Sequence, residues 1–172
     1  MSNTDLFLYG HQILLTDARG RKYLETLSIG DKFQCHLGVV EHQNIVNTPA
    51  GSWVSTNKKH LLFAEFPSFE DAVTLLNRAT QIIYPKDLAL IINKANIQEG
   101  DQVIEAGLGS GILTSAILRA IGRTGYITSY EINASVIPQA KENIAILTKG
   151  MDNYTIKTVS YTHLTLPTIC SV

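Results

Sequence analysis

The chain has 172 residues, of which 45% are hydrophobic and 17% charged, and its formal net charge is −1. This composition excludes a disordered or collagen-like chain and fits a protein with a buried core. The near-zero charge gives no overall electrostatic drive towards nucleic acid or an anionic membrane. Two cysteines are too few for a disulfide framework, and neither they nor the five histidines show metal-ligand spacing. We therefore expect no metal and a reducing compartment.

We recognise no targeting signal in the sequence. No apolar run approaches the roughly 20 residues that span a bilayer. The N-terminus carries Asp5 and no basic region before an apolar stretch, so no signal peptide is expected. We expect a cytoplasmic protein that does not associate with a membrane.

Residues 1–65 are predicted to form a small antiparallel β domain, barrel-like or a sandwich. Short β-rich runs alternate there with turn residues at intervals typical of such folds. The predicted strands are Gln12–Thr16, Arg21–Thr26, Phe33–Val40 and Gly51–Ser55. About 65 residues make a small independent core, so we expect this domain to pack on another part of the protein.

After Phe66 the hydrophobic period becomes helical. Ser68 is a candidate N-cap for a first helix, and Pro85 precedes a second helix at Lys86–Ala95. The elements expected beyond are a strand Gln102–Ala106, a helix Ile112–Ile121, a strand Tyr126–Glu131, a helix from the cap Asn133 to Leu147, and a strand Tyr154–Val159. Alternating strands and helices predict a parallel sheet of βαβ units, so residues 66–159 form a partial Rossmann-like domain.

Two features interrupt this pattern. Pro138 lies inside the last predicted helix, where it should remove a backbone hydrogen bond and kink the helix. Residues 160–172 contain no charged residue and carry Pro167 where a central strand or helix is due. We interpret residues 160–172 as a non-native tail, with a genuine C-terminal strand as the alternative, and leave them out of the fold prediction.

The main chemical signal is the glycine-rich run Val103–Gly111, which lies between the predicted strand and the helix that begins near Ile112. Glycines there let a ligand approach the main chain, and the amides at a helix N-terminus suit an anionic group. Glu131 ends the next strand, where a carboxylate accepts hydrogen bonds from ribose hydroxyls. Glu105 is predicted to be buried beside the loop, where it would fix loop amides or a ligand amino group, or play a plain structural role.

The spacing of these motifs resembles a known class. The pattern E-A-G-x-G-S-G, followed by Glu131, resembles class I S-adenosylmethionine-dependent methyltransferases. More narrowly, the run Thr80–Asp87 with its Tyr-Pro-Lys-Asp motif, the run Glu105–Gly111 and Ser129–Glu131 resemble the tRNA (adenine-58)-N1-methyltransferase family. The N-terminal region is similar to the small β domain of that family. The resemblance covers roughly residues 6–158.

The resemblance implies an α/β fold in which a small β domain precedes an incomplete class I methyltransferase sheet. It implies S-adenosyl-L-methionine as cofactor, tRNA as partner, methyl transfer to N1 of an adenine in the T-loop, and a homotetramer. The implied cofactor-binding residues are Glu105, Gly107, Gly109, Ser110, Gly111, Ile112, Leu113 and Glu131. Tyr84 is placed in the catalytic site, stacked on the target adenine; a buried aromatic at a helix start is the alternative.

The same resemblance implies that part of the site is missing. The family's acidic residue after the fourth strand would fall beyond Val159, and nothing in residues 160–172 matches it. We therefore expect the chain to correspond to the first half of the enzyme and to be inactive alone.

Two other functions remain open. One is a non-catalytic RNA-binding or interaction module formed by the β domain, which carries basic clusters at Arg19–Lys22 and Lys58–His60. The other is a nicotinamide-dependent oxidoreductase. Its dinucleotide loop has the spacing G-x-G-x-x-G, and the third glycine of this chain comes one residue too early for it.

Overall fold

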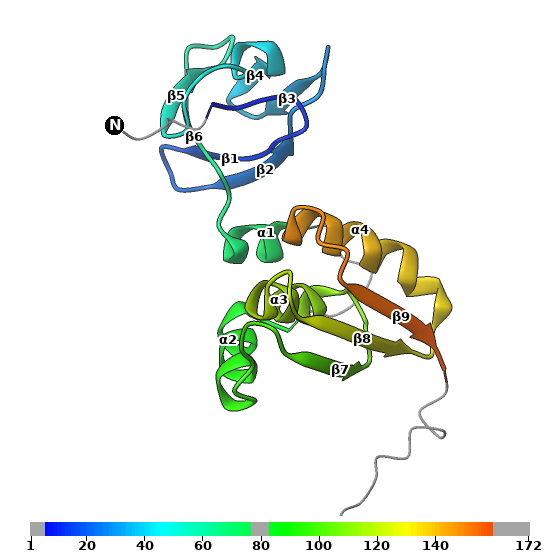
Figure 1. The fold of residues 1–172 in the computed structure, drawn as a ribbon. Coiled ribbons are helices and arrows are strands. Elements are labelled where there is room, and N and C mark those ends of the chain that lie inside the picture. Colours follow the sequence, from blue (N-terminus) through cyan, green and yellow to red (C-terminus); the bar gives the residue numbers. More distant parts are fainter. Residues whose placement is uncertain (1–5, 77–82, 160–172) are drawn as a thin grey trace, which may run out of the picture. The chain divides into compact units, whose positions relative to one another are not determined.

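The computed structural model describes residues 6–76 and 83–159, and the chain separates into two units, Met1–Leu76 and Asn77–Val172 (Figure 1). The expectations for residues 77–82, which include the start of the Thr80–Asp87 motif, lie outside the described residues. So does the interpretation of residues 160–172 as a non-native tail. Each unit is described by itself below.

The N-terminal unit is built from two antiparallel sheets, as predicted. Its larger sheet has the strand order β2-β1-β6-β5, and a separate hairpin pairs β3 with β4. The strands are β1 Gln12–Asp17, β2 Lys22–Thr26, β3 Lys32–Cys35, β4 Gly38–Glu41, β5 Ser52–Ser55 and β6 Leu61–Glu65. One prediction was wrong, because residues 33–40 form a hairpin and not one strand. Strand β6 was not predicted.

A hydrophobic core of its own stabilises this unit. It is formed by the buried side chains Phe7, Ile13, Leu15, Leu27, Phe33, Val40, Ile45, Val54, Leu62 and Ala64. The short helices are η1 His42–Asn44 and α1 Phe69–Leu75. Ser68 caps α1 as predicted, because its hydroxyl accepts a hydrogen bond from Asp71 N at 3.1 Å, and the Asp71 carboxylate accepts one from Ser68 N at 3.3 Å.

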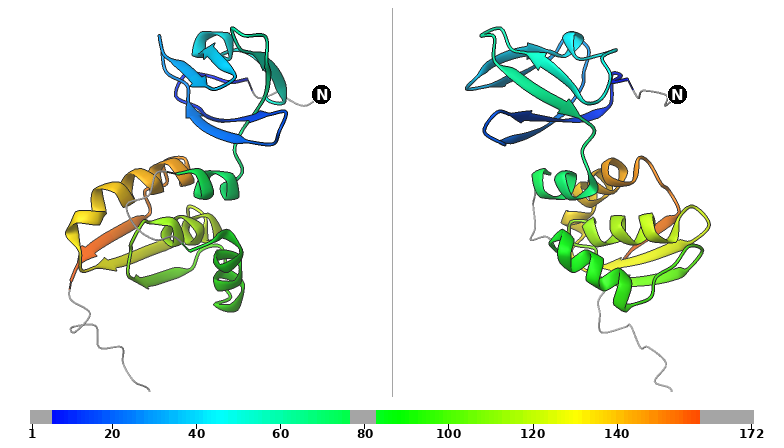
Figure 2. Two further views of the ribbon diagram at one scale, coloured as in Figure 1. Left: turned by 180° about the vertical axis from the view of Figure 1, so that it is seen from behind. Right: turned by 90° about the vertical axis from the view of Figure 1, so that its left-hand side faces the viewer.

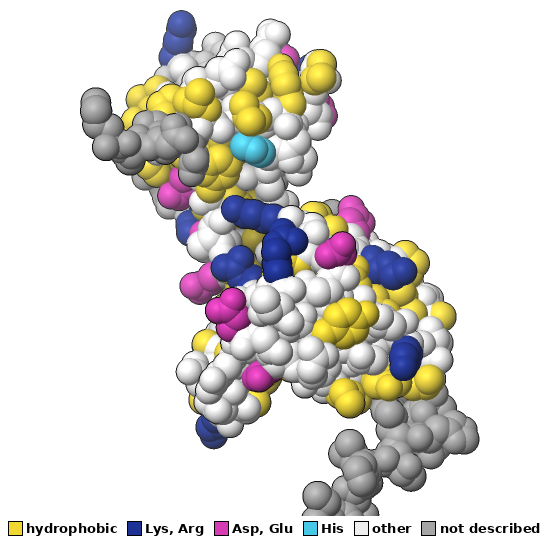
Figure 3. Space-filling model, in the orientation of Figure 1, with side chains coloured by type: hydrophobic (Ala, Val, Ile, Leu, Met, Phe, Trp, Pro, Cys, Tyr) yellow, Lys and Arg dark blue, Asp and Glu magenta, His cyan; other side chains and the backbone are white. Residues whose placement is uncertain are grey.

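The C-terminal unit contains the predicted parallel sheet, with strand order β7-β8-β9. Its elements are α2 Pro85–Lys94, β7 Gln102–Ala106, α3 Ile112–Ile121, β8 Tyr126–Glu131, η2 Ala134–Val136, α4 Ile137–Thr148 and β9 Tyr154–Thr158. Helices α3 and α4 pack together over one face of the sheet (Figure 2). On the other face Ile104 is 67% exposed, and hydrophobic side chains are visible among charged ones on the surface of this unit (Figure 3).

The predicted kink at Pro138 was wrong. Helix α4 begins at Ile137, so Pro138 lies in its first turn, where the missing N–H has no helical partner to lose. The 3-10 turn η2 precedes it, and the Asn133 side chain caps η2 by accepting a hydrogen bond from Ser135 N at 3.1 Å. Among the described residues, no helix is long and apolar enough to span a membrane.

The close packing of α3 on α4 at Gly111 gives a first prediction. A Cβ at Gly111 would lie 2.8 Å from the Ala140 carbonyl oxygen and 2.9 Å from Ile144 Cγ1, whereas a Cβ at Gly109 would meet open space. Both glycines have positive φ angles, so alanine brings backbone strain at either position. We expect Gly111→Ala to destabilise this unit by about 1–3 kcal/mol more than Gly109→Ala does, because of overpacking. Urea unfolding followed by far-UV circular dichroism measures both; equal losses would contradict the packing argument.

Candidate functional site

The candidate site lies where the neighbouring strands β7 and β8 end. The register pairs Ala106 with Tyr130, so the loop that follows β7 runs beside the end of β8. The N–H groups of Gly107 and Leu108 both donate to the Tyr130 carbonyl, at 2.8 and 3.2 Å. The loop is therefore held against β8 by backbone hydrogen bonds before α3 begins.

Glu131, the last residue of β8, joins the glycine loop to the end of this strand. Its Oε2 accepts a hydrogen bond from Gly109 N at 2.9 Å, and its Oε1 accepts from Ile132 N and Asn133 N, both at 2.8 Å. Burial by itself raises the pKa of Glu131, but these three backbone N–H groups lower it more, so the net pKa is below the usual value. Glu131 is thus an ionised carboxylate at the glycine loop, and the structure brings Gly109 and Glu131 together as their sequence positions suggested.

Glu105 lies deeper, at 5% exposure. Its Oε2 accepts hydrogen bonds from the hydroxyls of Thr114 and Ser129, each at 2.6 Å, and its Oε1 is buried without a partner among the described residues. Burial raises the pKa of Glu105, the hydrogen bonds from the two hydroxyls lower it by less, and the nearby Glu131 charge raises it further. In the part of the chain that the structure describes, Glu105 makes no hydrogen bond to a loop amide, so of its predicted roles the fixing of loop amides was wrong.

A side-chain hydrogen bond also joins the glycine loop to α4. Asn143, which is 2% exposed, donates from Nδ2 to the Ser110 carbonyl oxygen at 2.9 Å. Asn143, Thr114 and Ser129 were not predicted as site residues, although Ser129 belongs to the Ser129–Glu131 motif. The signal for Asn143 was present, because it is a polar residue among the buried apolar positions of α4.

The remaining predicted residues differ in exposure. Ile112 is 2% exposed and belongs to the buried core, and Leu113 is half-buried against the core. Gly109 has a φ of +53° and open space beside it, so a ligand can approach its backbone. Tyr84 precedes Pro85 at the start of α2 and is 58% exposed, so the alternative that it is a buried aromatic was wrong. Among the described residues, no group of three or more potential metal ligands comes together.

A strand, a glycine loop, a helix and a second strand that ends in a carboxylate place this unit in the class I methyltransferase fold. Solved structures that share the fold of the chain include the following two. An S-adenosylmethionine-dependent O-methyltransferase from Thermotoga maritima is 27% identical with a TM-score of 0.85, covering 92% of this chain and 59% of its own. The tRNA (m1A58) methyltransferase TrmI from Aquifex aeolicus is 23% identical with a TM-score of 0.78. The match covers 95% of this chain and 62% of the Aquifex chain.

The chain belongs to the family described as the tRNA methyltransferase complex GCD14 subunit, whose model matches residues 63–164. A TrmI-like N-terminal model matches residues 6–54. The tRNA (adenine(57)-N(1)/adenine(58)-N(1))-methyltransferase TrmI of Methanocaldococcus jannaschii is 34% identical over 131 residues, 76% of this chain and 45% of that protein. The tRNA (adenine(58)-N(1))-methyltransferase TrmI of Thermus thermophilus is 33% identical over 132 residues, 77% and 52%. The chain thus spans about half the length of the curated relatives it matches.

The environment of Glu105 predicts a pH effect on stability. Its raised pKa means that the folded state binds this proton more tightly than the unfolded state does, so the contribution of Glu105 to stability falls as the pH rises between the two pKa values. Glu105→Gln is neutral throughout and lacks this loss. We expect the unfolding free energy of Glu105→Gln minus that of the wild type to increase from about pH 4 to about pH 7, by about 1.4 kcal/mol for each unit of pKa shift.

Urea unfolding at a series of pH values measures this difference. The control is Glu142→Gln, which removes an exposed carboxylate on α4, and an equal increase in this variant would show that the effect is not specific to Glu105. A flat difference for Glu105→Gln would show that burial does not penalise its charge.

Proposed function

We propose that this chain binds S-adenosyl-L-methionine at the glycine loop, and that the bound cofactor serves methyl transfer to N1 of an adenine in the tRNA T-loop, at position 58. The observation that carries the proposal is the ionised Glu131 carboxylate beside the open backbone of Gly109. Membership of the GCD14 family and the printed functions of the TrmI relatives support the same reaction, and favour it over the nicotinamide alternative.

The described residues fit this cofactor. A carboxylate offers about four lone-pair positions, and the three backbone donors leave Glu131 one position for a ribose hydroxyl. The buried Oε1 of Glu105, which has no partner within residues 6–76 and 83–159, is suited to accept from the amino group of the methionine moiety. The glycines from Gly107 to Gly111 let the ligand approach the main chain. Ser110 and the backbone N–H groups of Ile112 and Leu113, in the first turn of α3, would complete the lining, while the side chain of Ile112 stays in the core.

In the proposed reaction the chain acts mainly by alignment. The cofactor supplies a methyl group on a sulfonium, which is already activated for attack by a ring nitrogen. Glu131 and the glycine loop fix the ribose and so the direction of the methyl group. In well-oriented systems such positioning contributes up to about 7–11 kcal/mol to lowering a barrier.

The substrate side of the proposal rests on Tyr84. Its ring is 58% exposed, so it is free to stack on an adenine turned out of the RNA. A tRNA partner is supported by the printed names of the relatives. The homotetramer and the cytoplasmic location are parts of the proposal that follow from the family resemblance alone.

Cofactor binding is tested on the 172-residue chain by isothermal titration calorimetry with S-adenosyl-L-methionine. Glu131→Gln keeps one acceptor oxygen but removes the charge, and Gly109→Val fills the open space beside the loop. We expect each variant to lower the affinity tenfold or more, because a hydrogen bond to a charged group contributes about 1.5–3 kcal/mol.

Glu142→Gln removes a carboxylate from the same unit and should bind like the wild type. The site assignment fails if Glu131→Gln and Gly109→Val also bind like the wild type. A parallel titration with a nicotinamide dinucleotide that gives the tighter complex would replace the proposed cofactor.

The role of Tyr84 is tested with a fluorescent T-loop RNA and fluorescence anisotropy. Tyr84→Ala should weaken RNA binding by roughly tenfold, since base–aromatic stacking contributes about 1–3 kcal/mol, whereas Tyr84→Phe should keep the affinity. Replacing the target adenine by uracil should reduce the wild-type affinity and have little effect in Tyr84→Ala. Unchanged RNA affinity in Tyr84→Ala would remove Tyr84 from the substrate site.

A further inference from the structure

Three turns of the N-terminal unit meet at one end of its larger sheet. The β1–β2 turn and the β5–β6 turn share this end, because β1 pairs with β6 up to Asp17 opposite Leu62, and β5 pairs with β6 up to Ser55 opposite Leu61. Hydrogen bonds join the β3–β4 hairpin to the β5–β6 turn at this end of the sheet. Asn57 N donates to Val39 O at 2.9 Å, and Val39 N donates to Asn57 Oδ1 at 3.0 Å.

These turns carry an excess of positive charge. The exposed basic and histidine residues at this end, which we call the basic turn surface, are Arg19, Arg21, His36, Lys58, Lys59 and His60. The carboxylate in the same turns is Asp17, whose side chain is only 1% exposed. A ligand that approaches the basic turn surface therefore meets cations, although the net charge of the whole chain is −1.

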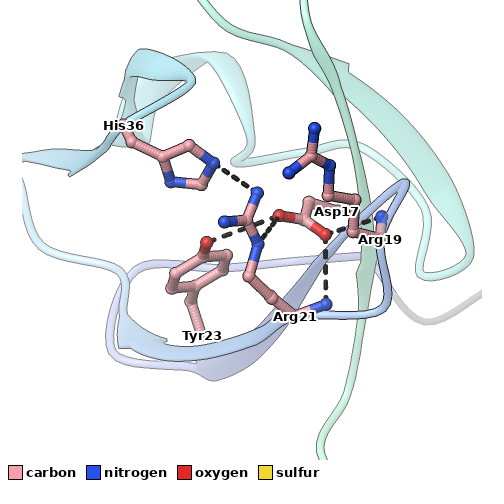
Figure 4. Close-up of polar contacts among 5 residues, drawn as sticks. All are labelled: Asp17, Arg19, Arg21, Tyr23 and His36. Carbon is pink, nitrogen blue, oxygen red and sulfur yellow. Dashed lines mark hydrogen bonds and ion pairs between the residues drawn. The ribbon is translucent and has the colours of Figure 1, made fainter.

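Asp17 is occupied in holding Arg21 (Figure 4). Its Oδ1 accepts from Arg19 N at 2.8 Å and from Arg21 N at 3.0 Å, and its Oδ2 accepts from Arg21 Nε at 2.7 Å. Burial raises the pKa of Asp17, but these backbone and guanidinium donors lower it more, so the carboxylate is ionised. The Arg21 side chain is 44% exposed, so the buried carboxylate orients a guanidinium whose outer nitrogens face solvent.

His36 shares the outer part of this guanidinium. Arg21 Nη2 and His36 Nε2 form a hydrogen bond in which the imidazole nitrogen is the acceptor, because a guanidinium has donors only (Figure 4). A phosphate oxygen is a better acceptor for the same N–H, since charge-assisted bonds are stronger than those to neutral acceptors. An anion at this place would accept from Arg21 beside the His36 ring.

An exposed aromatic lies next to the basic turn surface. Trp53, the single tryptophan of the chain, is 60% exposed on the edge strand β5, with its ring centroid 5.2 Å from that of Phe63. It lies two residues before Ser55, the last residue of β5, and so roughly 7 Å along the strand from the turn. Cations that contact phosphates and an aromatic side chain on which a base stacks are the two elements of single-strand RNA binding.

We propose that the basic turn surface binds the phosphodiester backbone of RNA, with Arg19 and Arg21 on phosphate oxygens and Trp53 stacked on a base. The inference rests on the proposed function, in which tRNA is the RNA partner, and adds the part of this chain that holds its backbone. Asp17 is a positioning residue in this arrangement, since it contacts Arg21 and not the RNA.

The test measures binding of a fluorescent, unmodified tRNA transcript to the 172-residue chain by anisotropy over a range of salt concentrations. We expect Arg19→Ala together with Arg21→Ala to weaken binding at least tenfold and to reduce the slope of log K against log salt by about 0.7–0.9 for each lost phosphate contact. Trp53→Ala should weaken binding roughly tenfold with an unchanged slope. In the wild type, RNA should quench the Trp53 fluorescence.

The control is Lys94→Ala. Lys94 is an exposed lysine in the last turn of α2, in the C-terminal unit, and is not part of the basic turn surface. The control variant should bind RNA within twofold of the wild type.

A second variant is needed because the loss of Arg21 leaves the buried Asp17 carboxylate without its guanidinium partner. Arg19→Ala alone serves this purpose, since Arg19 contributes only its backbone N–H to Asp17. Arg19→Ala should reduce the slope of log K against log salt by about 0.7–0.9, the value for one lost phosphate contact.

Unchanged affinity and salt slope in Arg19→Ala and in the double variant would overturn the inference. If Trp53→Ala alters self-association in sedimentation velocity and leaves RNA affinity unchanged, Trp53 belongs to a protein interface and that part of the proposal is wrong. Titration of the same preparations with S-adenosyl-L-methionine separates the two proposals. Cofactor binding with RNA affinity insensitive to these arginines refutes only the basic turn surface, and the converse result refutes only the proposed cofactor site.

Discussion

The hydrogen bond from Gly109 N to Glu131 is the interaction on which the candidate site depends. It joins the loop after β7 to the end of β8, two segments 22 residues apart in the sequence. The same carboxylate accepts from Ile132 N and Asn133 N, so one anion fixes both the glycine loop and the start of the next connection. Without it three backbone N–H groups would lose their acceptor, which is costly in a partly buried place. The geometry of the loop is therefore set by charge as much as by glycine.

The two carboxylates of the site carry out different tasks because their donors differ. Glu131 receives three backbone N–H groups, which stabilise its charge, whereas Glu105 receives two hydroxyls on one oxygen in a buried position. The pKa values of the two groups move in opposite directions as a result. A ligand with hydroxyls to donate is suited to Glu131. A cationic amino group is suited to Glu105, because it would compensate a charge that the protein itself stabilises poorly.

Much of the C-terminal fold was predictable, because glycines and alternating apolar residues mark its elements locally. The bounds of β7, α3 and β8 were predicted correctly, and so was the parallel sheet. Strand β6 was missed because Leu61–Glu65 is a short apolar run that shows no alternation. The hydroxyl partners of Glu105 were missed because they lie nine and 24 residues away, and only the tertiary fold brings them together. The kink at Pro138 was predicted wrongly because the helix was expected to begin after Asn133, whereas α4 begins at Ile137.

An acidic residue at the end of a strand organises the following turn in both units. Asp17 ends β1 and Glu131 ends β8, and each accepts hydrogen bonds from backbone N–H groups of the turn. They differ in what they leave exposed. Asp17 receives two backbone N–H groups of its turn, Arg21 Nε and the Tyr23 hydroxyl, which fill its acceptor positions, so the N-terminal unit presents the Arg21 cation. Glu131 receives three donors and keeps one acceptor position open, so the C-terminal unit presents an anion. Phosphates suit the first and ribose hydroxyls the second, in agreement with the RNA and cofactor sites proposed for the two units.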